Sequence, residues 1–91
     1  MSSKEKIQED VLVEEAVDKQ HEIVLYNDDV NTFDHVIEML IYACDHTAIQ
    51  AEQCAILVHY KGQCTVKTGD YEDLAPRCSV LLEAGLSAEV I

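Results

Sequence analysis

The feature that most constrains this chain is the junction between residues 21 and 37, where an apolar run stops at polar side chains just before an amphipathic helix. The run from Glu22 to Tyr26 is short and partly β-branched, which is typical of a strand. Asn27, Asp28 and Asp29 then place three side-chain acceptors at the edge of the expected core. Because loops at such junctions often hold recognition groups, we expect these acceptors to belong to a binding site.

The 91-residue length allows one small domain preceded by a polar leader. Residues 1–21 mix lysine with aspartate and glutamate around a short apolar patch, Val11 to Val13. This composition predicts a flexible N-terminal extension, since it offers little apolar surface to bury. Residues 22–91 carry the apolar periodicity of a folded core domain, with the modest core that about seventy residues can form.

The net charge of −12 and the sequence pI of about 4.4 restrict the classes of partner. Such acidity opposes attraction to nucleic-acid phosphates and to anionic membrane surfaces, so neither is an expected partner. Solubility alone explains the acidity as well as a preference for cationic ligands does. The start of the chain lacks an apolar signal region and no run is long enough to span a membrane, which predicts a cytoplasmic protein.

Four cysteines, Cys44, Cys54, Cys64 and Cys78, are widely spaced and include no CxxC pair. This spacing does not support a zinc ribbon or a redox motif. We interpret the cysteines as small apolar residues of the core, and we expect neither a metal nor a cofactor.

The hydrophobic pattern of residues 22–91 predicts three strands and three helices, in the order strand, helix, helix, strand, helix, strand. The runs are too short and the connections too mixed for a doubly wound parallel sheet. The expected fold is an α+β domain with three helices packed on one side of a small three-stranded antiparallel sheet. The expected strands are residues 22–26, 64–68 and 86–91, and the expected helices are residues 33–44, 47–60 and 71–84.

Local signals predict the helix ends. Thr32 and Asp70 are candidate N-caps for the first and third helices. The second helix begins with a capping-box pattern at Thr47 and ends at Gly62. Pro76 lacks an N–H group and clashes with the preceding turn, so the third helix is expected to open with an irregular turn. The residues expected to face the core are Phe33, Val36, Ile37, Leu40, Ile41, Cys44, Ala51, Cys54, Ala55, Val58, Cys64, Val66, Thr68, Leu74, Cys78, Leu81 and Leu82.

The loop that contains Asn27, Asp28 and Asp29, here called the acidic loop, admits other interpretations. Paired acid-base catalysis needs a defined gap between two carboxylates, which the neighbours Asp28 and Asp29 do not promise. A calcium loop is disfavoured because Thr32 stands where its turn needs glycine. An Asx-rich turn that only caps the first helix stays open. His59, at the end of the second helix, is by its pattern alone more typical of a hydrogen-bonded boundary residue than of a functional group.

Two motifs taken together resemble the ClpS family. The first is Val24-Leu-Tyr-Asn-Asp-Asp29 followed by the helix from Phe33, and the second is Val58-His-Tyr-Lys-Gly62 at the end of the second helix. ClpS proteins are adaptors, not enzymes, that deliver N-degron substrates to the ClpA or ClpC unfoldase of the Clp protease. The resemblance spans about residues 22–91. It implies a ClpS-like adaptor core, with a fold similar to the C-terminal domain of the ribosomal stalk protein, behind a flexible extension.

The resemblance also implies a role for particular positions. The α-amino group of an N-degron would be bound by Asn27, Asp28, Asp29 and His59, the last through its neutral ring. Glu72 and Arg77, on the third helix, are the candidates for contact with the unfoldase. The first side chain of the substrate, a Phe, Leu, Tyr or Trp, would enter a pocket lined by Asn31, Phe33, Val36, Ala55, Val58 and Leu86.

Two pocket positions depart from many relatives, which have methionine in place of Phe33 and methionine or another large aliphatic residue in place of Ala55. The small side chain of Ala55 predicts a wider pocket floor and weaker exclusion of Ile and Val, unless Phe33 leans in. The alternative function is a protein-interaction domain of ribosomal-stalk type, in which Asn27 to Asp29 only cap the first helix. Such a domain would treat a peptide with N-terminal Phe and its N-acetylated form alike.

Overall fold

The structure, a computed structural model, describes residues 20–91. The predicted order of elements and the predicted α+β fold are both confirmed. The extension predicted for residues 1–21 lies, except for its last two residues, outside the described residues. The elements are β1 (His21–Tyr26), α2 (Phe33–Cys44), α3 (Ala48–Lys61), β2 (Gln63–Gly69), α4 (Tyr71–Glu83) and β3 (Ser87–Val90).

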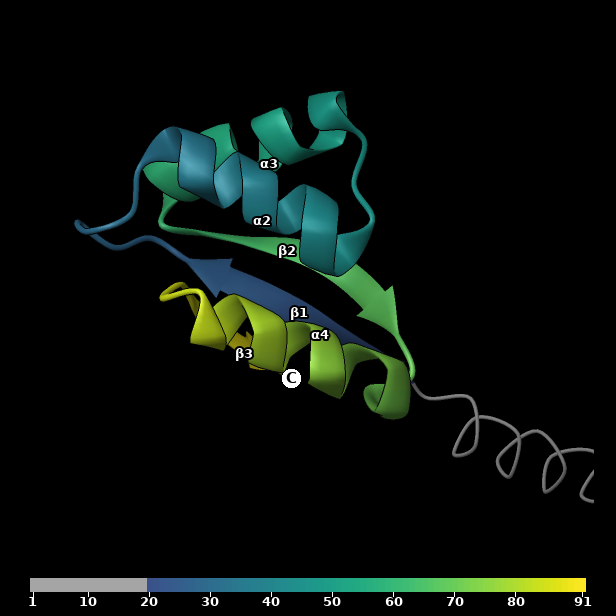
Figure 1. The fold of residues 1–91 in the computed structure, drawn as a ribbon. Coiled ribbons are helices and arrows are strands. Elements are labelled where there is room, and N and C mark those ends of the chain that lie inside the picture. The colour runs from purple at the N-terminus through teal and green to yellow at the C-terminus, as the bar shows by residue number, and fades with distance from the viewer. Residues whose placement is uncertain (1–19) are drawn as a thin grey trace, which may run out of the picture.

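The sheet has the strand order β2-β1-β3, and β1 pairs antiparallel with both neighbours. In Figure 1, α2 and α3 lie together near β2, whereas α4 runs beside β1 and β3. Ile23 and Leu25, which share one face of β1, pack with buried residues of all three helices. The core therefore lies between this face of the sheet and the helices.

The ends of α2 and α3 form where the local signals predict them. The hydroxyl of Thr32 accepts a hydrogen bond from the backbone N–H of His35 at 3.0 Å, so the first helix is capped. Thr47 and Gln50 make both bonds of the capping box, at 2.9 and 3.1 Å. Gly62 ends α3 with φ 92°, a left-handed conformation in which a side chain would be strained.

One prediction for α4 is confirmed and one is wrong. Asp70 occupies the predicted N-cap position, although its side chain makes no capping hydrogen bond, and its backbone carbonyl accepts the N–H groups of Asp73 and Leu74 at 3.0 Å. The prediction for Pro76 is wrong. Pro76 lies inside a helix that is regular from Tyr71, with no irregular opening turn. The missing donor of Pro76 affects only one carbonyl near the start of the helix. Packing of Leu74 and its neighbours in the core holds the remaining turns.

Three apolar residues of the helices that were predicted to face the core are instead substantially exposed. Phe33 and Ile41 of α2 are 42% and 40% exposed, and Leu82 of α4 is 51% exposed. All three lie at the margins of their apolar stripes, whereas the centres of the same stripes, such as Leu40 and Leu81, are fully buried. The apolar stripe on each of these helices is therefore wider than the surface that the helix buries against the core.

A β-bulge explains why Thr68 is exposed although simple alternation places it inward. Ile23 pairs with Lys67 while Val24 pairs with Thr65, so Val66 is the extra residue of β2. A residue inserted into one strand changes which face the following residues occupy. Val66 stays buried, and Thr68 moves to the solvent side.

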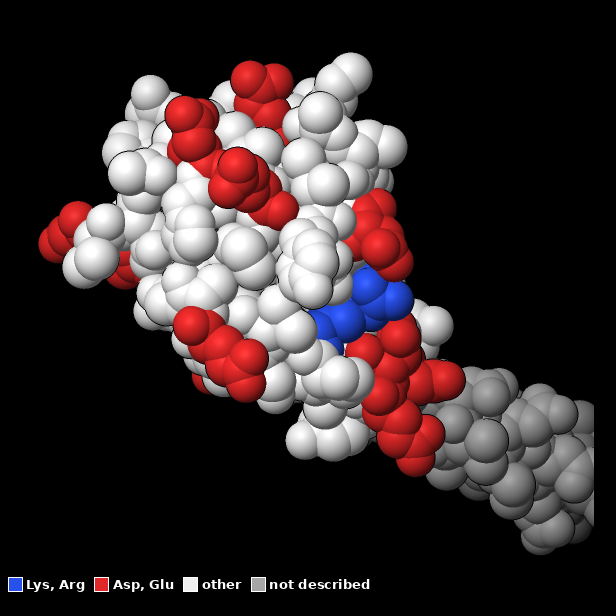
Figure 2. All heavy atoms as spheres, viewed as in Figure 1, with Lys and Arg blue, Asp and Glu red and all other residues white. Residues whose placement is uncertain are grey.

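Acidic side chains lie at several places on the face drawn in Figure 2, and basic atoms gather at one place between acidic ones. Much of this face is therefore negative or uncharged. Within residues 20–91, no helix has the length and apolar character needed to cross a membrane.

Candidate functional site

The loop after β1 is anchored to the end of α3. The backbone N–H of Asn27 donates to the carbonyl oxygen of Gly62 at 2.9 Å. His59 lies in the last turn of α3, three residues before this anchor. One hydrogen bond therefore brings the acidic loop and the histidine, which are about thirty residues apart in sequence, to the same end of the domain.

Asp28 organises this loop through hydrogen bonds inside the protein. Its Oδ1 accepts the backbone N–H groups of Val30 and Asn31, and its Oδ2 accepts Nδ2 of Asn31, each at 2.9 Å. These hydrogen bonds hold the pKa of the Asp28 carboxyl below its ordinary value, and the bond from the backbone N–H of Asn31 has the largest effect. An Asx turn is therefore present at Asp28, whereas the side chain that caps α2 is that of Thr32.

The same loop is also joined to the turn between α4 and β3. Nδ2 of Asn31 lies 2.8 Å from the carbonyl oxygen of Gly85. In the first turn of α2, Nε2 of His35 lies 2.9 Å from the carbonyl oxygen of Ala84. Sequence analysis did not name His35, since a contact between residues 49 apart leaves no periodic or spacing signal.

These connections enclose a pocket of about 350 Å³. All ten residues predicted for amine binding and for the side-chain pocket line it. Leu25 and Tyr26 line it as well, although sequence analysis did not assign them to the pocket. Their position at the end of β1, directly before Asn27, was the sequence signal that could have identified them as pocket residues.

The pocket has an apolar interior and a polar edge. Ala55, Val58 and Leu86 are 3%, 5% and 4% exposed, whereas Asn27, Asp29 and His59 are exposed. Within residues 20–91 the structure records no hydrogen bond to the side chains of these three polar residues. The His59 ring packs edge-to-face on Tyr60, with centroids 4.9 Å apart. The edge therefore offers acceptors to a ligand beside an apolar cavity.

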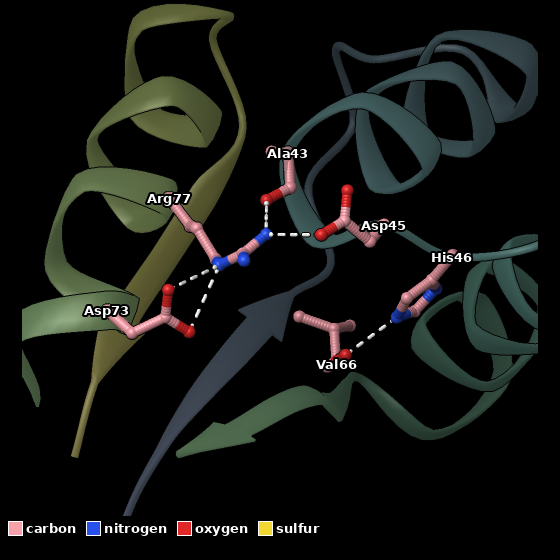
Figure 3. A network of polar contacts seen from close by, with 6 residues as sticks. All are labelled: Ala43, Asp45, His46, Val66, Asp73 and Arg77. Atoms are coloured by element: carbon pink, nitrogen blue, oxygen red, sulfur yellow. Dashed lines mark hydrogen bonds and ion pairs between the residues drawn. The ribbon is translucent and has the colours of Figure 1, made fainter. Parts of the chain in front are cut away.

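Arg77, predicted to contact a partner, is held by the protein itself, as Figure 3 shows. Its Nη1 donates to the carbonyl oxygen of Ala43 at 3.0 Å and to Asp45 at 3.1 Å, and its Nε donates to Asp73 at 3.3 Å. These bonds join α4 to the end of α2. Glu72, the other residue predicted for that contact, is exposed near the start of α4.

The four cysteines are free thiols within the described fold. Burial raises the pKa of Cys44 to about 11, and burial together with the neighbouring Cys64 raises that of Cys54 to about 11. Cys44 and Cys78 are buried, while Cys54 and Cys64 are half-buried at the edge of the core. No group of three or more His, Cys, Asp or Glu residues among residues 20–91 is arranged to hold a metal ion.

A sequence profile described as "ATP-dependent Clp protease adaptor protein ClpS" matches residues 16–89. The chain belongs to the ClpS family. The ClpS adapter of Acetivibrio thermocellus is 34% identical over 89 residues, which cover 98% of this chain and 88% of that protein. The ClpS adapter of Thermosynechococcus vestitus is 37% identical over 68 residues, which cover 74% of this chain and 72% of that protein.

The fold of this ClpS protein is also found among solved structures. Agrobacterium tumefaciens ClpS2 bound to L-phenylalaninamide matches it with a TM-score of 0.69 at 18% identity. The match covers 80% of this chain and 95% of that one. The resemblance inferred from the two sequence motifs is thus confirmed, and the protein is a ClpS adaptor of the Clp protease.

Proposed function

We propose that this ClpS protein binds the free α-amino group and the first side chain of proteins that start with Phe, Leu, Tyr or Trp, and delivers them to a Clp unfoldase. The observation that carries the proposal is the pocket itself. Residues from the β1–α2 loop, both following helices and the α4–β3 turn converge on one cavity with an acidic edge and an apolar interior. An N-terminal residue has the same two parts, a cation and a side chain, side by side.

The polar edge supplies the acceptors that an ammonium group needs. Such a group has three N–H donors, and Asn27, Asp29 and the neutral ring of His59 each offer an acceptor that no described residue occupies. Asp28 adds negative charge, while its own hydrogen bonds hold the loop. Hydrogen bonds to charged groups contribute roughly 1.5–3 kcal/mol each. A blocked N-terminus loses the charge and most of these bonds.

The apolar interior selects the side chain. Burying a Leu or Phe side chain contributes about 1.5–3 kcal/mol, and a polar side chain loses its hydration there without a matching hydrogen bond. The bound L-phenylalaninamide of Agrobacterium tumefaciens ClpS2 has a free amino group next to a phenyl ring. This ligand has the two chemical parts that the proposal assigns to the two halves of the pocket.

Two residues adjust the size of the pocket. Ala55 is buried and lines the interior with a minimal side chain, whereas Phe33 is 42% exposed. Both residues line the same pocket. We therefore propose that β-branched Ile and Val are less strongly excluded than they would be with a large residue at position 55.

The partner is proposed to be an AAA+ unfoldase of ClpA or ClpC type, and the protein to be a cytoplasmic adaptor without enzymatic activity. Glu72 and Arg77 are the two residues proposed to contact the unfoldase. Glu72 is the more accessible of the two, since Arg77 donates hydrogen bonds to Ala43, Asp45 and Asp73. The extension of residues 1–21 is proposed to help transfer the substrate to the unfoldase.

The experiment that tests the proposed site compares Asp29→Ala and His59→Ala with Asp34→Ala. Asp34 is an exposed carboxylate in the first turn of α2 and does not line the pocket, so its variant controls for the loss of one negative charge. Affinity for a peptide with N-terminal Phe should fall at least tenfold in the first two variants and little in the control, since about 1.4 kcal/mol is tenfold. Unchanged affinity in either site variant would contradict the proposed amine site.

A further inference from the structure

The end of α4 is fastened to the start of α2 by two side chains that donate to consecutive carbonyl groups. Asn31 reaches the carbonyl of Gly85 at 2.8 Å, and His35 reaches that of Ala84 at 2.9 Å. A carbonyl oxygen only accepts hydrogen bonds, so Nε2 of His35 carries the hydrogen and donates. The half-buried His35 therefore connects two elements that are far apart in sequence.

The carbonyls of Ala84 and Gly85 belong to the turn that ends α4, where backbone acceptors have no partner farther along the helix. Within the turn, the N–H of Leu86 donates to Leu81 and that of Gly85 to Leu82, at 3.0 Å each, and Gly85 has φ 90°. This is the pattern of a helix closed by a left-handed glycine. Asn31 and His35 supply the two donors that the turn does not supply for itself.

The turn leads directly into the pocket. Leu86 follows Gly85, is 4% exposed and lines the cavity, while Val36 follows His35 and also lines it. His35 does not line the pocket. The hydrogen bond from His35 to Ala84 therefore links the residue just before Val36 to the backbone two residues before Leu86.

We propose that His35 is a positioning residue of the side-chain pocket, and that its hydrogen bond to Ala84 sets the place of Leu86 relative to Val36. This inference rests on the proposed function. A pocket whose walls are already fixed binds a side chain tightly, because less ordering is required on binding. Loss of the bond lets the α4–β3 turn move and loosens the contact with a large first side chain.

The test uses two substitutions at position 35 and a matched control. His35→Gln keeps a donor close to the place of Nε2, whereas His35→Met has similar length and no donor. The control is His46→Met, because Nε2 of His46 also binds a backbone carbonyl, that of Val66 at 2.6 Å, and His46 is not among the pocket residues. Affinity for a peptide with N-terminal Phe is measured for the full chain, well below the thermal midpoint of each variant.

We expect H35M to bind about three- to tenfold more weakly than wild type, H35Q to recover most of the affinity, and H46M to bind as wild type even where its thermal midpoint falls. Equal affinity in H35M and wild type, or an equal loss in H46M, overturns the positioning role while leaving the proposed function intact. A wild-type protein that does not bind the peptide overturns both.

A measurement on the wild-type protein keeps the proposal testable if H35M does not fold. The ring resonances of His35 and the backbone amide resonance of Leu86 should shift in NMR spectra when the Phe peptide saturates the protein, and those of the His46 ring should not. Unchanged His35 and Leu86 resonances in a saturated complex would overturn the proposal.

Discussion

Asn31 binds Asp28 through two groups at once, its backbone N–H to Oδ1 and its side-chain amide to Oδ2, each at 2.9 Å. The same amide nitrogen also reaches the carbonyl of Gly85 at 2.8 Å. Asp28 therefore shapes the loop that presents its neighbours Asn27 and Asp29. The acidic loop is an ordered scaffold in addition to a source of negative charge.

The first prediction concerns the stability of this loop. Asp28→Asn should lower the free energy of unfolding at neutral pH by about 1–2 kcal/mol, because the new amide nitrogen faces the amide of Asn31 and one acceptor is lost. Urea unfolding of the two proteins measures the difference. A variant as stable as wild type at neutral pH would show that the Asp28 bonds do not hold the loop.

The pH dependence of that difference follows from the lowered pKa of Asp28. A carboxylate with a depressed folded pKa stabilises the fold above its unfolded pKa of about 3.9, and the contribution is lost as the pH falls through the lower folded value. The gap between wild type and D28N should therefore be complete near neutral pH and should close in strong acid. A gap that widens on acidification would contradict this sign.

The second prediction concerns His59 as a hydrogen-bond acceptor. His59→Gln keeps an oxygen acceptor at this position, whereas His59→Ala removes the acceptor. Affinity for a peptide with N-terminal Phe should therefore fall much less in H59Q than in H59A. Equal losses of affinity in the two variants would contradict the acceptor role of His59.

The third prediction concerns selectivity for the first side chain. Ala55→Met refills the buried space, so affinity for an Ile peptide should fall at least about fivefold more than affinity for a Phe peptide. Ala48→Met, at the exposed first position of α3 and away from the pocket, is the matched control. The selectivity hypothesis fails if wild type already rejects the Ile peptide at background level.

The fourth prediction concerns the thiols. Cys44 is 1% exposed and burial raises its pKa to about 11, so little thiolate forms near neutral pH. In the native protein, a thiol reagent should modify Cys44 and Cys78 much more slowly than the half-buried Cys64. In the unfolded protein, the three thiols should be modified at similar rates. Mass spectrometry of partly labelled protein distinguishes them. Fast labelling of Cys44 in the folded state would contradict its place in the core.

Much of this domain is encoded locally. Thr32, Thr47 and Gly62 act within one helical turn, which is why the helix ends were predictable from sequence. The residues of the pocket were named through the resemblance to the ClpS family, which implied roles for them at positions that the two sequence motifs locate.

The parts that sequence analysis missed depend on contacts between distant segments. The bulge at Val66 arises from pairing with β1, and the bonds from His35 to Ala84 and from Arg77 to Ala43 join residues 49 and 34 apart. None of these contacts has a spacing or periodicity of its own. They became visible only once the elements were packed together.

The most direct measurement of the central claim compares a peptide with N-terminal Phe with the same peptide acetylated at its N-terminus. Acetylation removes the charge and two of the three donors but keeps the phenyl ring. Because hydrogen bonds to charged groups contribute roughly 1.5–3 kcal/mol each, the acetylated peptide should bind at least about a hundredfold more weakly. Affinities for the two peptides that agree within about twofold would contradict the amine socket formed by Asn27, Asp29 and His59.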